Sequence, residues 1–367
     1  MSATGASAGG KWDCRKFGTS SDPVRQSALN SVASQNGCPK RYFYERESAA
    51  AGTTPPRRAN WKPVLGTAVH AVIERGLTKT WALLSTIYGP DATVERPAGA
   101  KLDWAPDALR KRIDEVLREE LKNECVKLAG VDENGQPRGP LPIEWYDDKP
   151  ETEIAAGVAM ALGALRTTVE RAESIVGTEV PFRASLEGYE LEGTIDLLYR
   201  RRGDGAICIV DWKTGERKLP QILLDYGYQP ATYAYAVEHG RLWAGTDSEV
   251  IVGEHPAELH IVHLRDFVPY VKKPKAAGKG VGDLRGPGWY ASQRRSEDRA
   301  RLAASLRAVV GTVRMNRRLE ALGEQCARCP FKGACLGDGY APAGDDAKAL
   351  DASMRGLDLG DTDDLSV

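Results

Sequence analysis

The sequence predicts an α/β fold, with a helical first half, a central group of strands and a helix that follows them. Apolar residues recur at helical spacing within residues 63–176. Alternation of apolar and polar residues, which is typical of strands, begins near Glu179. With 42% hydrophobic and 28% charged residues among 367, the chain has a globular composition and can bury a sizeable core.

Three helices are expected before the first strand. The first begins near Pro63, which suits a helical first turn, and carries Leu65, Val69 and Ile73 at helical spacing. The other two cover residues 105–128 and 154–176. A shorter helix within residues 27–46 precedes all three.

The predicted strands cover residues 180–184, 189–199, 206–212 and 258–264. Asp204 and Gly205 form a tight-turn dipeptide between the second and third strands, so these two should pair as a hairpin. Helices are expected at residues 229–239 and 296–322, with a loop rich in Gly, Lys and Pro before the second one.

Several classes of protein are excluded or disfavoured. No apolar run approaches the roughly 20 residues that a bilayer span needs. The first ten residues are rich in Ser, Ala and Gly without an apolar segment, so we expect a cytoplasmic protein and not a secreted one. Seven cysteines in such a chain indicate thiols or metal ligands before disulfides.

The formal net charge of −1 conceals an uneven distribution. Residues 345–367 carry seven Asp against one Lys and one Arg, a net charge of −5. Residues 272–301 carry nine Lys or Arg against three acidic residues, a net charge of +6. The sequence therefore predicts a polyanionic partner for the basic stretch and a solvated acidic tail.

The strongest candidate site lies on the predicted hairpin. Asp211 and Lys213 share one face of their strand because the side-chain period is two, and the turn brings Asp196 beside them. Clustered carboxylates repel each other, and a hard cation such as Mg²⁺ or Mn²⁺ relieves the repulsion. Lys213 would orient a water molecule or stabilise charge on a phosphate. A salt-bridged surface hairpin is the alternative, but the apolar flanks indicate a semi-buried strand pair.

These residues resemble the PD-(D/E)xK nuclease motif in its RecB-like form. The segment Gly66-Thr-Ala-Val-His70 resembles the metal-binding histidine motif of that family, and Gln229-Pro-Ala-Thr-Tyr233 resembles its glutamine and tyrosine motif. Pro230 departs from the family pattern and implies that Gln229 lies at a helix N-terminus. The resemblance implies a restriction-endonuclease-like core, a mixed sheet flanked by helices, and Mg²⁺ or Mn²⁺ as the cofactor.

The resemblance also implies a role for each residue. His70, Asp196 and Asp211 would hold the metal, and Lys213 would position the attacking water. Gln229 and Tyr233 would orient the DNA or the lysine. Glu179, one strand before the hairpin, is a secondary candidate because the family often has an acid there.

A second constellation is formed by Cys326, Cys329 and Cys335, with Cys38 as the expected fourth member. Spacing alone allows a four-cysteine zinc site or a four-iron cluster. One N-terminal and three C-terminal cysteines around a RecB-like core resemble the iron–sulfur subgroup, which includes AddB-type nucleases and the CRISPR-associated Cas-four exonucleases. That resemblance implies a [4Fe–4S] cluster. Cys125 and Cys208 fall on apolar faces and are expected in the core, and no role is expected for Cys14.

The function predicted from these features is a metal-dependent DNA exonuclease that acts on ends, with single-stranded DNA as its partner. No phosphate-binding Walker A motif occurs, so the chain is not expected to be the helicase half of a RecB- or AddB-type machine. A structure-specific endonuclease of the same fold and a non-catalytic DNA-binding or adaptation subunit are the alternatives. The basic stretch would guide the strand, although a solvated basic loop remains the alternative there. The expected DNA contacts are Lys272, Lys273, Lys275, Lys279, Trp289 and Tyr290.

The sequence predicts six regions along the chain. They are a disordered head (1–23), a helical region with Cys38 and His70 (24–178), the nuclease core (179–268), a basic loop (269–295), a C-terminal helix with the cysteine cluster (296–340) and a disordered acidic tail (341–367).

Overall fold

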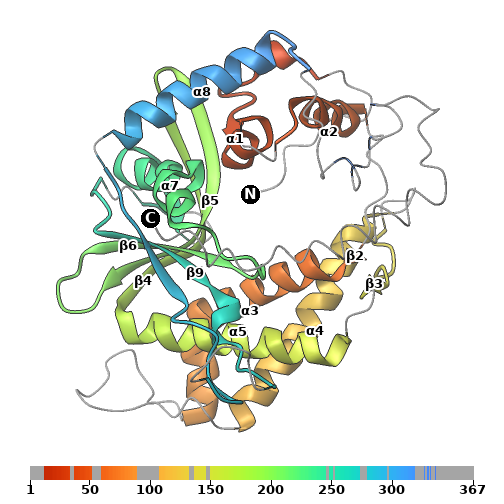
Figure 1. Cartoon of the computed structure of the whole chain (residues 1–367), viewed down its shortest axis with the longest axis vertical. Helices are drawn as coiled ribbons and strands as arrows, with labels where there is room; N and C mark the ends of the chain where they lie inside the picture. Colours follow the sequence, from red (N-terminus) through yellow and green to blue (C-terminus); the bar gives the residue numbers. More distant parts are fainter. Residues whose placement is uncertain are drawn as a thin grey trace.

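The computed structural model describes most of the chain, and Figure 1 shows a central sheet with helices on both faces. No helix in this described part is long and apolar enough to cross a membrane. The described residues are 12–33, 37–51, 59–88, 107–131, 136–145, 149–244, 248–250, 253–272, 279–295 and 297–318, with Cys326, Cys329, Phe331 and Cys335.

The elements alternate between helices and strands in a mixed order. The α-helices are α1 (Gln26–Ala33), α2 (Pro39–Ala51), α3 (Trp61–Tyr88), α4 (Asp107–Ala129), α5 (Pro150–Arg171), α6 (Gln221–Tyr226), α7 (Tyr228–His239) and α8 (Asp298–Arg314), with short 3-10 turns η1 (Cys14–Lys16) and η2 (Leu264–Phe267). The strands are β1 (Val24–Arg25), β2 (Ala59–Asn60), β3 (Ile143–Glu144), β4 (Ala172–Leu186), β5 (Tyr189–Arg201), β6 (Ile207–Lys213), β7 (Arg241–Ala244), β8 (Ser248–Val250), β9 (Glu258–His263) and β10 (Trp289–Ser292).

The central sheet is mixed, and most of its strands are antiparallel. Its order is β10-β9-β6-β5-β4-β7-β8, with β1 added in parallel to β5. Strand β6 lies in the middle, antiparallel to β5 and parallel to β9. Its first six residues are all buried, as expected for a strand covered on both faces. The α/β class and the β5–β6 hairpin that the sequence predicts are therefore confirmed.

Two hydrophobic clusters cover the two faces of the sheet. Helices α3, α4 and α5 pack on one face, together with Val210 and Trp212 of β6. Helices α1, α7 and α8 pack on the other face, together with Ile209 of the same strand. Because side chains alternate along β6, Asp211 and Lys213 point to the α7 side. The strand thus passes between the two helical layers and ends where both can supply side chains to one site.

Two helix ends differ from the prediction. The third helix, expected to reach residue 176, ends at Arg171, and residues 172–176 open strand β4. Ile175 pairs with Tyr199 of β5 there, so tertiary pairing overrides the local helical pattern. The last helix, expected to reach residue 322, ends at Arg314. Asn316 follows in the left-handed region (φ 52°), a conformation that commonly terminates helices.

Strand β10 lies inside the segment that the sequence assigns to a loop, residues 269–295. Trp289 pairs with Val262, and Ser292 with Leu259, along the edge of β9. Residues 289–292 are too few to show the alternating pattern of a strand. They form one because they pair with the edge of β9.

The head is also more ordered than predicted, at least over residues 12–23. Phe17 is 1% exposed, and its carbonyl accepts a 2.7 Å hydrogen bond from Arg314 Nε of α8. Trp12 packs on Phe43 of α2, with ring centroids 5.5 Å apart. These aromatic contacts account for the ordered structure of residues 12–23, because they bury apolar surface against α2 and α8. Residues 1–11 and the acidic tail at 341–367 lie outside the described residues.

Candidate active site

The two strands of the β5–β6 hairpin bring the predicted carboxylates together. Lys213 Nζ lies 2.6 Å from Asp211 Oδ2 on the shared face of β6. Asp196 of β5 reaches the same place, and its Oδ2 accepts a 2.7 Å hydrogen bond from the backbone N–H of Trp212. Asp211 is fully buried, so the ammonium of Lys213 supplies the counter-charge that a buried carboxylate requires.

Helix α7 adds Gln229 and Tyr233 to this pair. The side-chain amide of Gln229 donates to Asp211 Oδ1 at 2.8 Å, and its Oε1 accepts from Lys213 Nζ at 3.0 Å. The same Nε2 lies 2.9 Å from the Tyr233 hydroxyl, one helical turn further on. Gln229 is the second residue of α7, so it lies at the helix N-terminus, as Pro230 implies. It fixes the positions of Asp211 and Lys213 at once.

Helix α3 supplies His70 from the opposite side of the sheet. His70 Nδ1 lies 3.7 Å from Glu179 Oε1 and 3.9 Å from Asp196 Oδ2. The helix can come this close because Gly66 faces the end of β6. A Cβ atom at that position would lie only 2.7 Å from Thr214 Oγ1.

We expect Gly66→Ala to reduce catalysis because the added methyl group pushes α3, and with it His70, away from β6. Removal of the obstructing hydroxyl in Gly66→Ala/Thr214→Ala should restore much of the lost rate, since the next Thr214 atom lies 3.8 Å away. Gly311→Ala in α8, where nothing lies within 4 Å, is the matched control. Rates of DNA cleavage for the four proteins test this; equal loss in the single and double variants would contradict the steric explanation.

Glu179 of β4 completes a compact group of ligand atoms. One atom each from His70, Glu179 and Asp196 lie within 4.8 Å of one another. The neighbours Thr178 and Val180 pair with Leu197 and Ile195, which places Glu179 opposite Asp196. Its φ of 45° is left-handed, a conformation that costs a non-glycine residue about 1–3 kcal/mol. The sequence indicates an acid here only as a secondary candidate, and no local pattern encodes this strained backbone.

The crowding of carboxylates alters the acidity of the group. Burial, and then the charge of Asp211, raise the pKa of Asp196 to about 7. Burial lowers the pKa of His70, but the neighbouring carboxylates of Glu179, Asp196 and Asp211 more than offset it, and the net shift is upward. For Lys213 the same balance also leaves the pKa raised, because Asp211 and Asp196 outweigh burial. Three carboxylates thus face one ammonium and one imidazole, and a bound cation would relieve the repulsion among the carboxylates.

Comparison with known proteins identifies the family. A family model described as the PD-(D/E)XK nuclease superfamily matches residues 26–336. The chain belongs to this superfamily. Among curated proteins, none matches the sequence. Membership makes the chain a nuclease, and DNA is the substrate that the superfamily implies.

The donor set of this PD-(D/E)XK nuclease fits a divalent cation of the kind the superfamily uses, Mg²⁺ or Mn²⁺. Carboxylate oxygens of Glu179 and Asp196 converge with one imidazole nitrogen, and oxygen-rich sets are those that hard cations prefer. Both oxygens of Asp211 are engaged with Gln229 and Lys213. Its role as a metal ligand therefore stays a prediction.

Arg265 is a supporting residue that the sequence does not single out. It lies in η2, directly after β9, and is 7% exposed. Its guanidinium pairs with Glu153 of α5 at 2.8 Å and donates to the carbonyl of Thr214 at 3.3 Å. In this nuclease, Arg265 thereby connects the end of β6 to the helical layer that carries His70. Arg265 and Glu153 are 112 residues apart in the sequence, so no local motif predicts their ion pair.

The predicted DNA contacts of the basic stretch differ in their exposure and in their protein partners. Lys272 is exposed, whereas Lys279 donates to the carbonyl of Arg285 at 3.4 Å. Lys273 and Lys275 lie outside the described residues. The two rings have protein partners. Trp289 donates to Thr167 Oγ1 at 2.9 Å beneath Arg171, and Tyr290 bonds Asp266 and Lys218. The base-stacking role of both rings stays a prediction.

The four predicted cluster cysteines come from two ends of the nuclease that lie close together. Burial raises the pKa of Cys329, and nearby Cys38 and Cys326 contribute to the same upward shift. Lys40 of α2 donates to the carbonyl of Cys335 at 3.2 Å. Tyr44 of α2 stacks on Phe331 with centroids 5.5 Å apart. Cys125 and Cys208 are buried in the core, as the sequence predicts.

Proposed function

We propose that this nuclease is a metal-dependent DNA exonuclease that acts on single-stranded ends. The observation that carries the proposal is the convergence of His70, Glu179 and Asp196 beside the Lys213–Asp211 pair. The resemblance of the histidine motif and of the Gln229 and Tyr233 motif to RecB-like exonucleases favours the exonucleolytic mode. The net charge of +6 over residues 272–301 favours a polyanionic strand as the substrate.

In this proposal His70, Asp196 and Asp211 hold the cation, with Glu179 as a further ligand. The bound cation would lower the pKa of a water molecule and neutralise charge on the scissile phosphate. Asp211 also anchors Lys213, so its carboxylate connects the metal ligands to the lysine.

Lys213 acts as a fixed positive charge. Its raised pKa keeps it an ammonium at neutral pH, so it donates hydrogen bonds and does not accept a proton from water. Gln229 holds the ammonium through its carbonyl oxygen while its amide nitrogen holds Asp211. The lysine therefore orients the attacking water or stabilises the negative charge that develops on the phosphate.

The test is degradation of DNA by the purified full-length protein. Single strands labelled at either end, the same strands with blocked ends, and closed circles are incubated with Mg²⁺ or Mn²⁺. An exonuclease releases short products from free ends and spares circles. Cleavage of circles or blocked strands would favour an endonuclease of the same fold, and the absence of any metal-dependent cleavage would favour a DNA-binding subunit.

We also propose that Cys38, Cys326, Cys329 and Cys335 bind a [4Fe–4S] cluster. Four thiols from two distant segments match the ligand number of such a cluster, and zinc would accept the same number. The contacts of α2 with Cys335 and Phe331 keep the two segments together. The resemblance to the iron–sulfur subgroup favours iron.

A further inference from the structure

The segment that connects β6 to α7 begins and ends at the active site. It follows Lys213 and leads into Gln229, and these two side chains are hydrogen-bonded at 3.0 Å. Between them, residues 215–223 are all exposed to solvent. The segment is therefore anchored at the active site at both of its ends.

The second half of this segment, which ends in α6, exposes apolar side chains. Four large side chains in and just before α6 are exposed, a set that we call the α6 ridge. They are Leu219 (41% exposed), Ile222 (64%), Leu223 (51%) and Tyr226 (41%). Apolar groups gathered this way on a protein surface commonly mark a binding site, because water contact with them is unfavourable.

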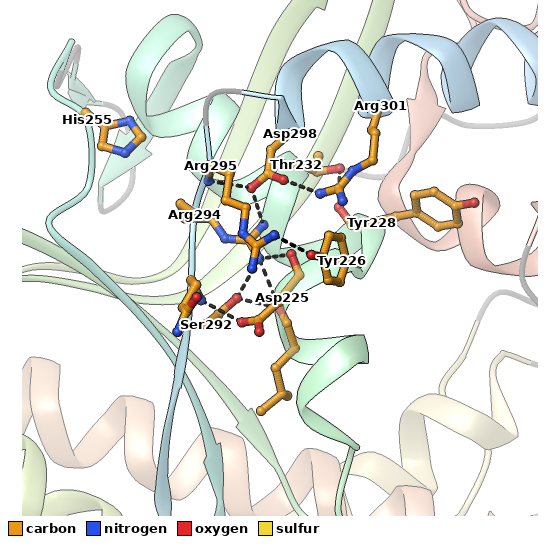
Figure 2. A network of polar contacts seen from close by, with 12 residues as sticks. Asp225, Tyr226, Tyr228, Thr232, His255, Ser292, Arg294, Arg295, Asp298 and Arg301 are labelled. Atoms are coloured by element: carbon orange, nitrogen blue, oxygen red, sulfur yellow. Dashed lines mark hydrogen bonds and ion pairs between the residues drawn. The ribbon is translucent and has the colours of Figure 1, made fainter.

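The α6 ridge is held rigidly from behind by a buried arginine. Figure 2 shows Arg294 among Asp225, Ser292 and Asp298. The Arg294 side chain is 5% exposed, donates to the carbonyls of Leu224 and Asp225, and lies 3.3 Å from Asp298. Asp225 in turn accepts a 2.7 Å hydrogen bond from the backbone N–H of Gln293. A short exposed helix fixed by buried polar contacts is preorganised for a ligand.

Arginine and lysine side chains border the α6 ridge at both ends, although Arg301 also pairs with Asp298, and Lys218 with Asp266. Arg295 and Arg301 lie beside the ring of Tyr226, with guanidinium carbons 5.0 and 4.4 Å from its centroid, as Figure 2 shows. Exposed Arg217 and Lys218 precede Leu219 at the other end. Apolar and aromatic side chains flanked by cations complement a strand whose bases are exposed and whose phosphates are charged.

We propose that the α6 ridge binds the bases of an unpaired DNA strand, while Arg217, Arg295 and Arg301 contact its phosphates. This inference rests on the proposed function and names the substrate that the same site favours. A duplex keeps its bases stacked inside and would offer the ridge only its backbone. Tyr226 precedes Gln229 by three residues, so their Cα atoms lie within about 11 Å.

The test uses the full-length protein with Asp196→Asn, which should bind DNA without cleaving it. Into this background we place Ile222→Ser/Leu223→Ser and measure dissociation constants by fluorescence anisotropy. The probes are a single strand, the same strand with abasic sites, and a blunt duplex. The double substitution should weaken single-strand binding at least about fivefold, because two aliphatic side chains lose their apolar contact with the bases. Binding of the abasic strand and of the duplex should stay unchanged.

Two controls separate the apolar contribution from the charged one. Met315→Ser removes a side chain that is 66% exposed elsewhere on the surface and should change no affinity. Arg295→Gln should weaken binding of all three probes and flatten its dependence on salt, because one phosphate contact is lost.

The outcomes distinguish this inference from the proposed function. Unchanged single-strand affinity in the folded double variant, or equal loss for the abasic strand, overturns the assignment of the α6 ridge while wild-type cleavage stands. Loss of self-association in the double variant, with DNA affinity unchanged, would overturn it in favour of a contact between two copies. If the wild-type protein neither cleaves nor binds DNA, the proposed function itself fails.

Discussion

Replacing Asp196 by asparagine should lower the rate of DNA cleavage at least about 10²- to 10³-fold, as loss of a central electrostatic contact does. Asparagine keeps an oxygen for the backbone N–H of Trp212, so the local hydrogen bond survives. The same substitution should raise the melting temperature of metal-free protein, because it removes one negative charge from a buried group that already contains Asp211. Cleavage rates and thermal unfolding in the presence of a chelator measure the two effects.

Asp204→Asn provides the matched control for this prediction. Asp204 lies at the turn of the same β5–β6 hairpin, where it pairs with Arg201, away from the metal-binding group. The Asp204→Asn protein should cleave DNA at the wild-type rate. If Asp196→Asn remained as active as Asp204→Asn, the assignment of the site would be wrong. If it were inactive but less stable than wild type, the like-charge explanation would fail.

Much of the fold follows from local pattern. The period of Leu65, Val69 and Ile73 places α3 correctly, because all three bury one helical face. Asp204 and Gly205 predict the β5–β6 turn because few residues other than glycine adopt its left-handed backbone; Gly205 has φ 66°. The parallel pairing of β6 with β9 could not be predicted, since α6, α7, β7 and β8 separate the two strands along the chain.

The sequence predicts those parts of the candidate site that follow from the side-chain periods of a strand and a helix. The period of two predicts that Asp211 and Lys213 share a face, and the period of the helix predicts the same for Gln229 and Tyr233. The hydrogen bonds that join these two pairs depend on how α7 packs on β6. That packing is tertiary, and no spacing within either motif specifies it.

The functional residues that the sequence did not predict make contacts between segments that are far apart in the chain. Arg265 joins Thr214 and Glu153, which belong to different layers of the structure. The α6 ridge is inconspicuous in the sequence because Leu, Ile and Tyr in a short helix usually indicate core. The contacts that hold this helix come from Arg294 and its partner Asp298, which lie about 70 positions further along the chain.

Cys329→Ala should remove the bound metal and lower the stability of the chain substantially. Anaerobically purified wild-type protein should be brown and contain about four iron and four sulfide per chain. The cluster would join Cys38 to Cys326, which are 288 positions apart, and so restrict the unfolded chain strongly. For a cross-link of that span the entropic model gives about 6 kcal/mol. Metal analysis and thermal unfolding under anaerobic conditions measure both losses.

Cys208→Ala is the control because it also removes one thiol. Cys208 is fully buried on β6 beneath the helices that cover the sheet, and its thiol contacts the carbonyl of Ala206 at 3.7 Å. Its loss should create a small cavity and cost about 1 kcal/mol, with the metal content unchanged. The two variants therefore differ in metal content even if both are less stable. Zinc in place of iron in the anaerobic protein would refute the iron–sulfur cluster and leave the nuclease site untouched, since the two centres share no ligand.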